Sequence, residues 1–344
     1  MRWLFLGAGA IGTYVGGSLA AAGEQVTFSE QPATVKAISA KGLVLHRGTE
    51  TRTVRDFRIV GSAAEALAAG PYDVGVFALK SFDTAAAVDQ LVATGHPVPP
   101  ILSLQNGVDN EATIAARLGA DRVITGTVTT AVGKPGVGEV IEEKRRGMGI
   151  ALGHPLSEPI AAALDRAGLA ARTFPEAGPM KWSKLLTNLT GNATSAILDL
   201  PVATLFADRQ LYQVEVAVLR ECLAVMRALG YPPVDLPGTP VRLLALAAGK
   251  LPRFIAQPAL TKALGSGRGD KMPSFHIDLH SGRGKSEVYW LNGAVARIGA
   301  EHGVDAPVNR VLTEVLQALT DGTEPLDTYR GKPDALLARI ASRR

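Results

Sequence analysis

Residues 4–12 read LFLGAGAIG, an apolar run that leads into a glycine-rich turn. Gly7, Gly9 and Gly12 have the spacing G-x-G-x-x-G, which is typical of loops that bind a dinucleotide. In such a loop the first glycine permits a tight turn, the second lets the backbone approach a pyrophosphate, and the third lets a helix pack closely against a strand. We therefore expect a nucleotide-binding turn near the start of this chain.

The residues on either side of this turn support the same interpretation. The run RWLFLG at 2–7 predicts a β-strand, and AIGTYVGGSLAAAG at 10–23 predicts a helix that ends at Gly23. The N-terminus of a helix that starts here offers unpaired N–H groups and a positive dipole end to the phosphates. Ala10 and Ile11, between the second and third glycines, complete the predicted cofactor loop.

An acidic residue closes the second predicted strand, EQVTFSE at 24–30. Glu30 follows Gly12 by 18 residues, a position where an acid can accept hydrogen bonds from the adenosine ribose hydroxyls and would repel a 2′-phosphate. Gln31 comes next, and the nearest basic residue downstream is Lys36. NADPH or NADH is therefore the expected cofactor, and Glu30 with Gln31 favours NADH.

Strands and helices continue to alternate through the first half of the chain. Further strands are expected at 72–80 and 99–107, with a helix within 81–94 between them. This alternation predicts an α/β fold with a Rossmann-type, doubly wound parallel sheet. Residues 122–143 place β-branched residues on both sides of a glycine and proline turn, so we expect them to extend this sheet with antiparallel strands. A last helix and strand are expected over 157–178.

Helical patterns replace the strands after about residue 178. The expected helices lie at 179–201, 208–230 (with Asp208 as N-cap), 239–251, 286–302 and 307–320. Residues 265–285 are expected to form a long loop. We therefore expect a dinucleotide-binding domain at 1–177 and an all-helical domain for substrate and dimer contacts at 178–344.

One of these predicted helices carries an unusual row of polar residues. In KLLTNLTGN, residues 184–192, Lys184, Asn188 and Asn192 recur every four residues and are predicted to share one helix face beside an apolar stripe. By itself such a row is either a solvated edge or the lining of a cleft.

Composition and charge exclude several classes of protein. The formal net charge is +4 over 344 residues, and the basic residues are dispersed, which argues against a nucleic-acid partner. No run of 18 apolar residues is present, so we expect no membrane span and a cytoplasmic location. The single cysteine, Cys222, lies in a helical pattern as an expected core residue and excludes an internal disulfide.

The histidines do not form a metal-binding pattern in the sequence. His276 and His280 are one helical turn apart, but the only acid between them is Asp278, and no third ligand is evident. We therefore expect no metal site.

Several segments together resemble the ketopantoate reductase (2-dehydropantoate 2-reductase) family. They occur in the family's order: GAGAIG (7–12), FALKSFDT (77–84), SLQNGV (103–108), KWSKLLTNLTGNATSA (181–196) and KMPSFHIDLHSGRGKSEVYWLNG (271–293). The lysine and two asparagines on one helix, followed by a distant serine and glutamate, are more specific than the glycine loop. The resemblance implies a Rossmann domain and an all-helical domain with the site between them. It also implies NAD(P)H-dependent reduction of 2-dehydropantoate to (R)-pantoate in pantothenate biosynthesis.

The resemblance implies a role for each matching polar residue. Lys184 matches the catalytic lysine, whose ammonium protonates the oxygen of a 2-keto group as hydride reaches the carbon. Asn188 and Asn192 match the substrate-binding asparagines, and Ser274 matches the serine that contacts the substrate carboxylate. Glu287 matches the acid that bonds the substrate or orients the lysine.

Two further residues match positions near the nicotinamide, and two departures from the family stand out. Lys80 and Asn106 each follow a predicted strand of the sheet, at the carboxyl ends where such folds bind ligands. The family's commonest pattern has arginine, for the 2′-phosphate of NADPH, where this chain has Gln31. The segment between Ser274 and Glu287 is also slightly longer than in the best-known members.

These departures leave alternatives open. One is a reductase of the same fold that acts on a different 2-keto acid. A second is a dehydrogenase that oxidises an alcohol or an opine-like amine with NAD, and a third is a non-catalytic NAD(P)-sensing module. In each case the expected ligand is a small molecule, and the helical domain is expected to support a homodimer.

Overall fold

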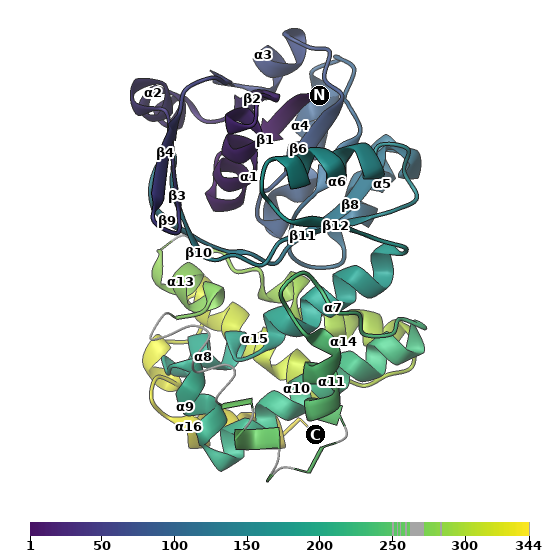
Figure 1. Cartoon of the computed structure of the whole chain (residues 1–344). Helices are drawn as coiled ribbons and strands as arrows, with labels where there is room; N and C mark the ends of the chain where they lie inside the picture. The colour runs from purple at the N-terminus through teal and green to yellow at the C-terminus, as the bar shows by residue number, and fades with distance from the viewer. Residues whose placement is uncertain are drawn as a thin grey trace. The chain divides into compact units, whose positions relative to one another are not determined.

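The chain forms two compact units, which are described separately (Figure 1). The computed structural model describes residues 1–249, 251–252, 254, 256–258, 260–261, 272–282 and 284–343. The first unit comprises Met1–Lys181 with Leu236–Thr239, and the second comprises Trp182–Asp235 with Pro240–Arg344. The domain boundary expected between residues 177 and 178 remains a prediction.

An eight-stranded sheet organises the first unit, in the order β12-β11-β8-β7-β6-β1-β2-β5. The strands from β8 to β5 are parallel neighbours, while β11 is antiparallel to β8 and parallel to β12. The strand bounds are β1 Arg2–Leu6, β2 Gln25–Ser29, β5 Arg58–Val60, β6 Val74–Phe77, β7 Ile101–Ser103, β8 Val123–Val128, β11 Met148–Ala151 and β12 Ala171–Phe174. The predicted Rossmann-type sheet is confirmed.

Helices cover both faces of this sheet, as the burial of β1 shows. Trp3 and Phe5 belong to a core cluster with residues of α1 and α6, whereas Leu4 belongs to a second cluster with residues of α3, α4 and α5. Successive strand residues point to opposite faces, so a strand that is apolar throughout must be buried on both. The helices are α1 Ala10–Ala21, α2 Pro32–Lys41, α3 Ala63–Ala68, α4 Thr84–Ala93, α5 Asn110–Leu118 and α6 Ser157–Arg166, with short 3-10 turns η1 Ser81–Asp83 and η2 Ala120–Arg122.

A second sheet of four strands, in the order β4-β3-β10-β9, packs on α1. It consists of β3 Leu43–Arg47, β4 Glu50–Val54, β9 Ala131–Gly136 and β10 Glu139–Lys144. The expectation that 122–143 extends the main sheet with antiparallel strands is therefore wrong in part. β8 joins that sheet in parallel, but β9 and β10 pair antiparallel with each other, and β10 adds in parallel to β3.

Two adjacent glycines let α1 lie between the two sheets. A Cβ atom at Gly16 would stand 2.6 Å from the ring of Phe28 in β2, and one at Gly17 would stand 3.1 Å from Leu45 in β3. Larger residues at either position would force the layers apart, since packed interiors leave little spare space. Tyr14 adds a polar link, because its hydroxyl donates to Glu142 Oε2 of β10 at 2.6 Å.

The second unit is built from helices over its described residues. The helices are α7 Ala177–Leu189, which begins in the first unit, α8 Asn192–Leu198, α9 Val202–Ala207, α10 Arg209–Ala228, α11 Val241–Gly249, α13 Ser274–His280, α14 Asn292–Glu301, α15 Pro307–Asp321 and α16 Pro333–Ala341, with η3 Val288–Trp290 and η4 Leu326–Thr328. The predicted cap of α10 is confirmed, because the Asp208 carboxylate accepts from the N–H groups of Gln210 and Leu211. Cys222 is fully buried, as expected.

Three of the expectations for the helical half are wrong. The helix expected at 286–302 begins only at Asn292, as α14, after the 3-10 turn η3. The single helix expected at 179–201 is divided into α7 and α8, because Gly191 adopts a left-handed conformation (φ 65°). In addition, the loop expected at 265–285 contains helix α13; residues 265–271 and 283 of that loop lie outside the described residues. Among the helices that the structure describes, none combines the length and apolarity needed to cross a bilayer.

Candidate functional site

The glycine loop between β1 and α1 has the geometry that its sequence predicts. Gly7 has φ +96°, and a Cβ atom there would stand 2.9 Å from Leu79 Cδ2. A Cβ atom at Gly12 would stand only 2.3 Å from the carbonyl oxygen of Gly7, so the turn excludes any larger residue at that position. A Cβ atom at Gly9 would have no protein atom within 4 Å, so open space lies beside the backbone there for a ligand.

Helix α1 begins directly after this open position. Gly9 is its N-cap, and the N–H of Thr13 donates to the carbonyl oxygen of Gly9 at 2.9 Å. The first N–H groups of an α-helix have no acceptor within the helix, so those of Ala10, Ile11 and Gly12 are the groups that can bind an anion. The loop and helix therefore fit a dinucleotide pyrophosphate.

Glu30 lies against the same loop. Its Oε1 accepts a hydrogen bond from the backbone N–H of Ala8 at 2.5 Å, and its Oε2 accepts one from Gln31 at 3.0 Å. The loop is also attached to β2 directly, because the N–H of Gly7 donates to the carbonyl oxygen of Ser29 at 3.0 Å. A carboxylate offers about four acceptor positions, so these two bonds leave capacity for ribose hydroxyls.

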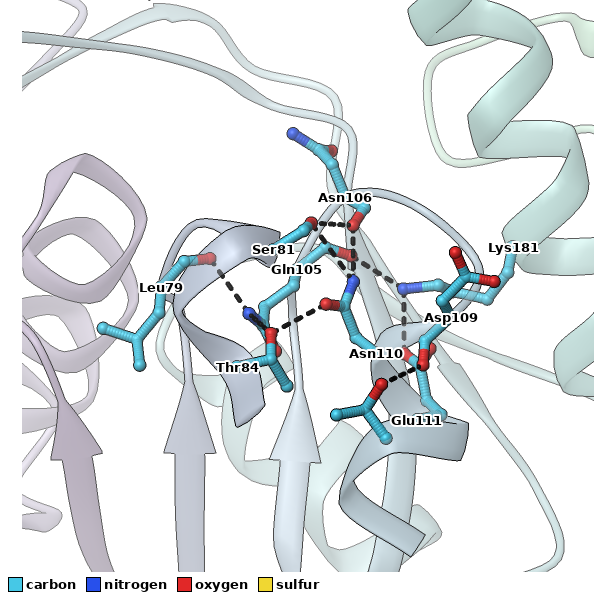
Figure 2. A network of polar contacts seen from close by, with 10 residues as sticks. Leu79, Ser81, Thr84, Gln105, Asn106, Asp109, Asn110, Glu111 and Lys181 are labelled. Atoms are coloured by element: carbon cyan, nitrogen blue, oxygen red, sulfur yellow. Dashed lines mark hydrogen bonds and ion pairs between the residues drawn. The ribbon is translucent and has the colours of Figure 1, made fainter. Parts of the chain in front are cut away.

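The loops that carry Lys80 and Asn106 are joined at the carboxyl ends of β6 and β7. Ser81 donates from Oγ to the backbone carbonyl of Asn106 at 2.8 Å, and Asn110 Nδ2 donates to the same carbonyl at 2.6 Å. In Figure 2 the side-chain amide of Asn106 points away from this network, which uses only its backbone. The network thus fixes the Asn106 backbone while directing the amide elsewhere.

Gln105 forms the centre of this network and was not predicted as a site residue. Its Nε2 donates to Thr84 Oγ1 at 2.7 Å and to the carbonyl oxygen of Leu79 at 3.2 Å, which joins the loop after β6 to the loop after β7. Its backbone carbonyl accepts from Lys181 Nζ at 2.7 Å, and that ammonium also pairs with Glu111 at 2.8 Å (Figure 2). In the sequence, the one signal for Lys181 is its position one helical turn before Lys184.

In the second unit, four of the predicted residues form one continuous set of hydrogen bonds. Lys184 Nζ donates to Asn188 Oδ1 at 2.7 Å. Asn192 Nδ2 donates to the backbone carbonyl of Asn188 at 3.1 Å and to Ser274 Oγ at 3.3 Å. The N–H of Phe275 donates to Asn192 Oδ1 at 3.1 Å, which determines which end of that amide is the donor.

The break at Gly191 changes how these residues meet. Asn192 does not continue the helix of Lys184 and Asn188 but opens α8, so the predicted single face of one helix is wrong at its third position. The turn is held because Glu215 Oε2, from α10, accepts the N–H of Gly191 at 2.6 Å. A Cβ atom at Gly191 would stand 2.7 Å from Val202, so a larger residue there is excluded.

Glu287 also lies in the second unit and is 2% exposed. It precedes η3, and its backbone carbonyl accepts the N–H groups of Trp290 and Leu291. Burying a carboxyl side chain costs free energy unless the group is hydrogen-bonded or paired. Acids buried in this way are often functional. The roles assigned above to these site residues remain predictions.

Comparison with known families identifies both halves of the chain. A family model described as ketopantoate reductase PanE/ApbA matches residues 3–153, and one described as ketopantoate reductase PanE/ApbA C terminal matches residues 178–320. A 2-dehydropantoate 2-reductase of Halobacterium salinarum is 28% identical over 335 residues, which cover 94% of this chain and all of that protein.

Solved structures share the fold over nearly the whole chain. A PanE/ApbA family ketopantoate reductase from Ralstonia eutropha JMP134 has a TM-score of 0.79 and 30% identity, covering 94% of this chain and 99% of that one. D-mandelate dehydrogenase, solved with NADH and anilino(oxo)acetate, has a TM-score of 0.76 and 21% identity, with coverage of 95% and 99%. At that lower identity the second likeness concerns the fold alone.

Proposed function

The chain belongs to the ketopantoate reductase family and is an oxidoreductase acting on a CH–OH group, and from this membership we propose that it reduces 2-dehydropantoate to (R)-pantoate with NAD(P)H. The observation that carries the proposal is the continuous set of hydrogen bonds through Lys184, Asn188, Asn192 and Ser274. These are the residue types that a 2-keto acid needs: a proton donor for the keto oxygen and neutral polar side chains for the hydroxyl and carboxylate.

The first unit supplies the residues that would hold the cofactor. Those proposed are Gly7, Gly9, Ala10, Ile11, Gly12, Glu30, Lys80 and Asn106. When bound, a reduced nicotinamide supplies the hydride that the keto carbon receives. The open space at Gly9 and the N-terminus of α1 support a pyrophosphate position there.

Lys184 is the proposed general acid. As hydride reaches the keto carbon, negative charge develops on the keto oxygen, and the Nζ ammonium transfers a proton to it. Asn188 Oδ1 accepts one N–H of that ammonium, which orients Nζ along α7. A positioned acid of this kind typically contributes about 10²–10⁴-fold to the rate.

Asn192 and Ser274 are the proposed contacts to the substrate's polar groups. The Asn192 amide is fixed on both sides, since its oxygen accepts from Phe275 and its nitrogen donates to Asn188 and Ser274. A pre-oriented amide and hydroxyl lose little entropy when substrate binds. We propose Glu287 as a second acid of the site, which bonds the substrate or orients the lysine.

Glu30 supports NADH as the preferred cofactor within this proposal. Its carboxylate lies at the end of β2 against the glycine loop, where a ribose 2′-phosphate would meet a like charge. Gln31 stands beside it in place of the arginine that the family commonly uses. The ratio of kcat/KM for NADH and NADPH tests this preference.

A second candidate is a dehydrogenase of the same fold with another 2-hydroxy or 2-keto acid as substrate. It is favoured by the segment between Ser274 and Glu287, which is slightly longer than in the best-known members of the family. The same-fold dehydrogenase acting on an alcohol or opine-like amine and the non-catalytic sensing module stay as further alternatives. A homodimer and a cytoplasmic location are likewise proposals.

One plate of assays distinguishes these functions. Purified protein is mixed with NADH or NADPH and with ketopantoate or other 2-keto acids, and cofactor oxidation is followed. Fast turnover of ketopantoate supports the leading proposal. Turnover of another 2-keto acid alone supports the second candidate, and cofactor binding without turnover in either direction supports the sensing module.

A further inference from the structure

Three potential metal ligands converge on the surface of the second unit, and none of them has a role in the function proposed above. One ligand atom from each of Asp199, His276 and His280 lies within 4.8 Å of the other two. His276 Nε2 is 2.6 Å from Asp199 Oδ1, and the two imidazole rings have their centroids 4.2 Å apart. We propose that these three residues bind a divalent first-row transition-metal ion such as Zn²⁺ or Co²⁺.

Two packed helices bring the ligands together. His276 and His280 lie one turn apart on α13, so their side chains lie on the same face of that helix. Asp199 terminates α8, 77 residues away in sequence from His276. The two helices pack against each other, and the bonds from Asn192 to Ser274 and Phe275 hold them in register.

Asp199 has an unusual backbone conformation at the end of α8. Asp199 has φ +54°, a left-handed conformation that residues other than glycine rarely adopt. In this conformation its N–H donates to the carbonyl oxygen of Ser195, so Asp199 caps the C-terminus of α8. The carbonyl end of a helix attracts cations, so α8 and its terminal aspartate both favour a positive ion here.

The ligand set suits transition ions better than calcium or magnesium. Two imidazole nitrogens and one carboxylate oxygen are the protein ligands of many zinc sites, in which a water completes a fourth position. Imidazole also suits copper, nickel and iron, whereas calcium and magnesium prefer sites made only of oxygen. The side chains are accessible to an ion, with Asp199 38% and His276 16% exposed.

The existing contacts of Asp199 are compatible with a metal. His276 Nε2 and Asp199 Oδ1 already lie within hydrogen-bond distance of each other, at 2.6 Å. A metal ion would take the place of the proton that His276 and Asp199 Oδ1 share, because metal binding displaces ligand protons. Arg330 Nε approaches the other oxygen, Oδ2, at 3.5 Å, and the Arg330 side chain is 46% exposed, so its charge is screened by solvent.

Titration of the metal-free, full-length protein with Zn²⁺ or Co²⁺ in a calorimeter tests the proposal without any activity assay. Wild type should bind one ion with a thermal-unfolding shift to higher temperature. His276→Ala, His280→Ala and Asp199→Asn should each weaken binding by at least about tenfold, since each loses one of three protein ligands. Asp199→Asn preserves the shape of the side chain, which guards against a result caused by misfolding.

His302→Ala is the matched control, because His302 is an exposed histidine of the same unit outside the cluster. It should bind the ion as wild type does. The proposal is overturned if wild type binds no ion, if any one of the three ligand variants keeps wild-type affinity, or if His302→Ala loses binding as well.

Discussion

Lys181 Nζ donates a hydrogen bond of 2.7 Å to the backbone carbonyl oxygen of Gln105, the residue before Asn106. The same ammonium pairs with Glu111, and the side chains are only 6% and 16% exposed. Lys184 follows one turn later on α7, about 4.5 Å along the helix axis. The part of α7 that lies in the first unit is therefore anchored where the loop after β7 begins.

Breaking this buried pair should destabilise the protein. Lys181→Met removes the cation and leaves Glu111 as an unpaired, largely buried carboxylate, which typically costs about 3–5 kcal/mol. Urea denaturation of the variant and of wild type measures the difference in the free energy of unfolding. The double variant Lys181→Met/Glu111→Gln should recover part of the loss, because it contains no unpaired charge. Equal stability of the single variant and wild type would show that the pair contributes nothing.

The glycine loop offers a pair of variants with opposite expected behaviour. Gly12→Ala places a Cβ atom 2.3 Å from the carbonyl oxygen of Gly7, so we expect a lower melting temperature together with weaker cofactor binding. Gly9→Ala meets no protein atom within 4 Å, so it should keep the wild-type melting temperature and weaken NADH binding alone. Thermal unfolding and fluorescence titration with NADH measure the two properties. Unchanged NADH affinity in Gly9→Ala would contradict the pyrophosphate position.

Cofactor preference should respond to charge at the end of β2. Gln31→Arg introduces a cation beside the proposed ribose site without removing the bond from Ala8 to Glu30. We expect the kcat/KM ratio of NADPH to NADH to rise by roughly tenfold, which corresponds to about 1.4 kcal/mol. Gln31→Leu, which adds no charge, is the control. A ratio that the arginine leaves unchanged would place the 2′-position of the ribose elsewhere.

Alkaline pH should weaken the contact between α1 and β10. Burial, with the hydrogen bond to Glu142, raises the pKa of Tyr14 from 10.0 to about 12. Because the folded-state pKa is the higher one, this contribution to stability is complete below pH 10 and is lost as the pH rises toward 12. The difference in unfolding free energy between wild type and Tyr14→Phe should therefore shrink over that interval. A difference independent of pH would contradict the assignment.

Local patterns predicted most of the first unit because its signals are short in range. The glycine spacing, the strand before it and Glu30 at the end of β2 all lie within the first 30 residues of the chain, and each is set by neighbouring residues. The β9–β10 hairpin was also visible locally. The sheet to which this hairpin belongs could not be predicted, because β10 pairs with β3, which is remote in sequence.

The errors in the second unit have the same origin. Nothing near Gly191 shows that a glutamate of α10 accepts its N–H, and that long-range bond holds the turn that separates α7 from α8. Helix α13 is flanked by glycine, proline and serine, which predict a loop, and it is stabilised by packing on α8. For the same reason the sequence does not show Asp199 as the proposed third ligand, because it lies beside His276 and His280 only in the folded chain.

Steady-state kinetics of Lys184→Met with ketopantoate tests the central claim most directly. The substitution keeps the length and apolar stem of the side chain and removes the proton donor, together with its bond to Asn188. We predict a decrease in kcat of about 10²–10⁴-fold, with the dissociation constant for NADH close to that of wild type. A variant that keeps most of the wild-type kcat would contradict the role of Lys184 as the general acid.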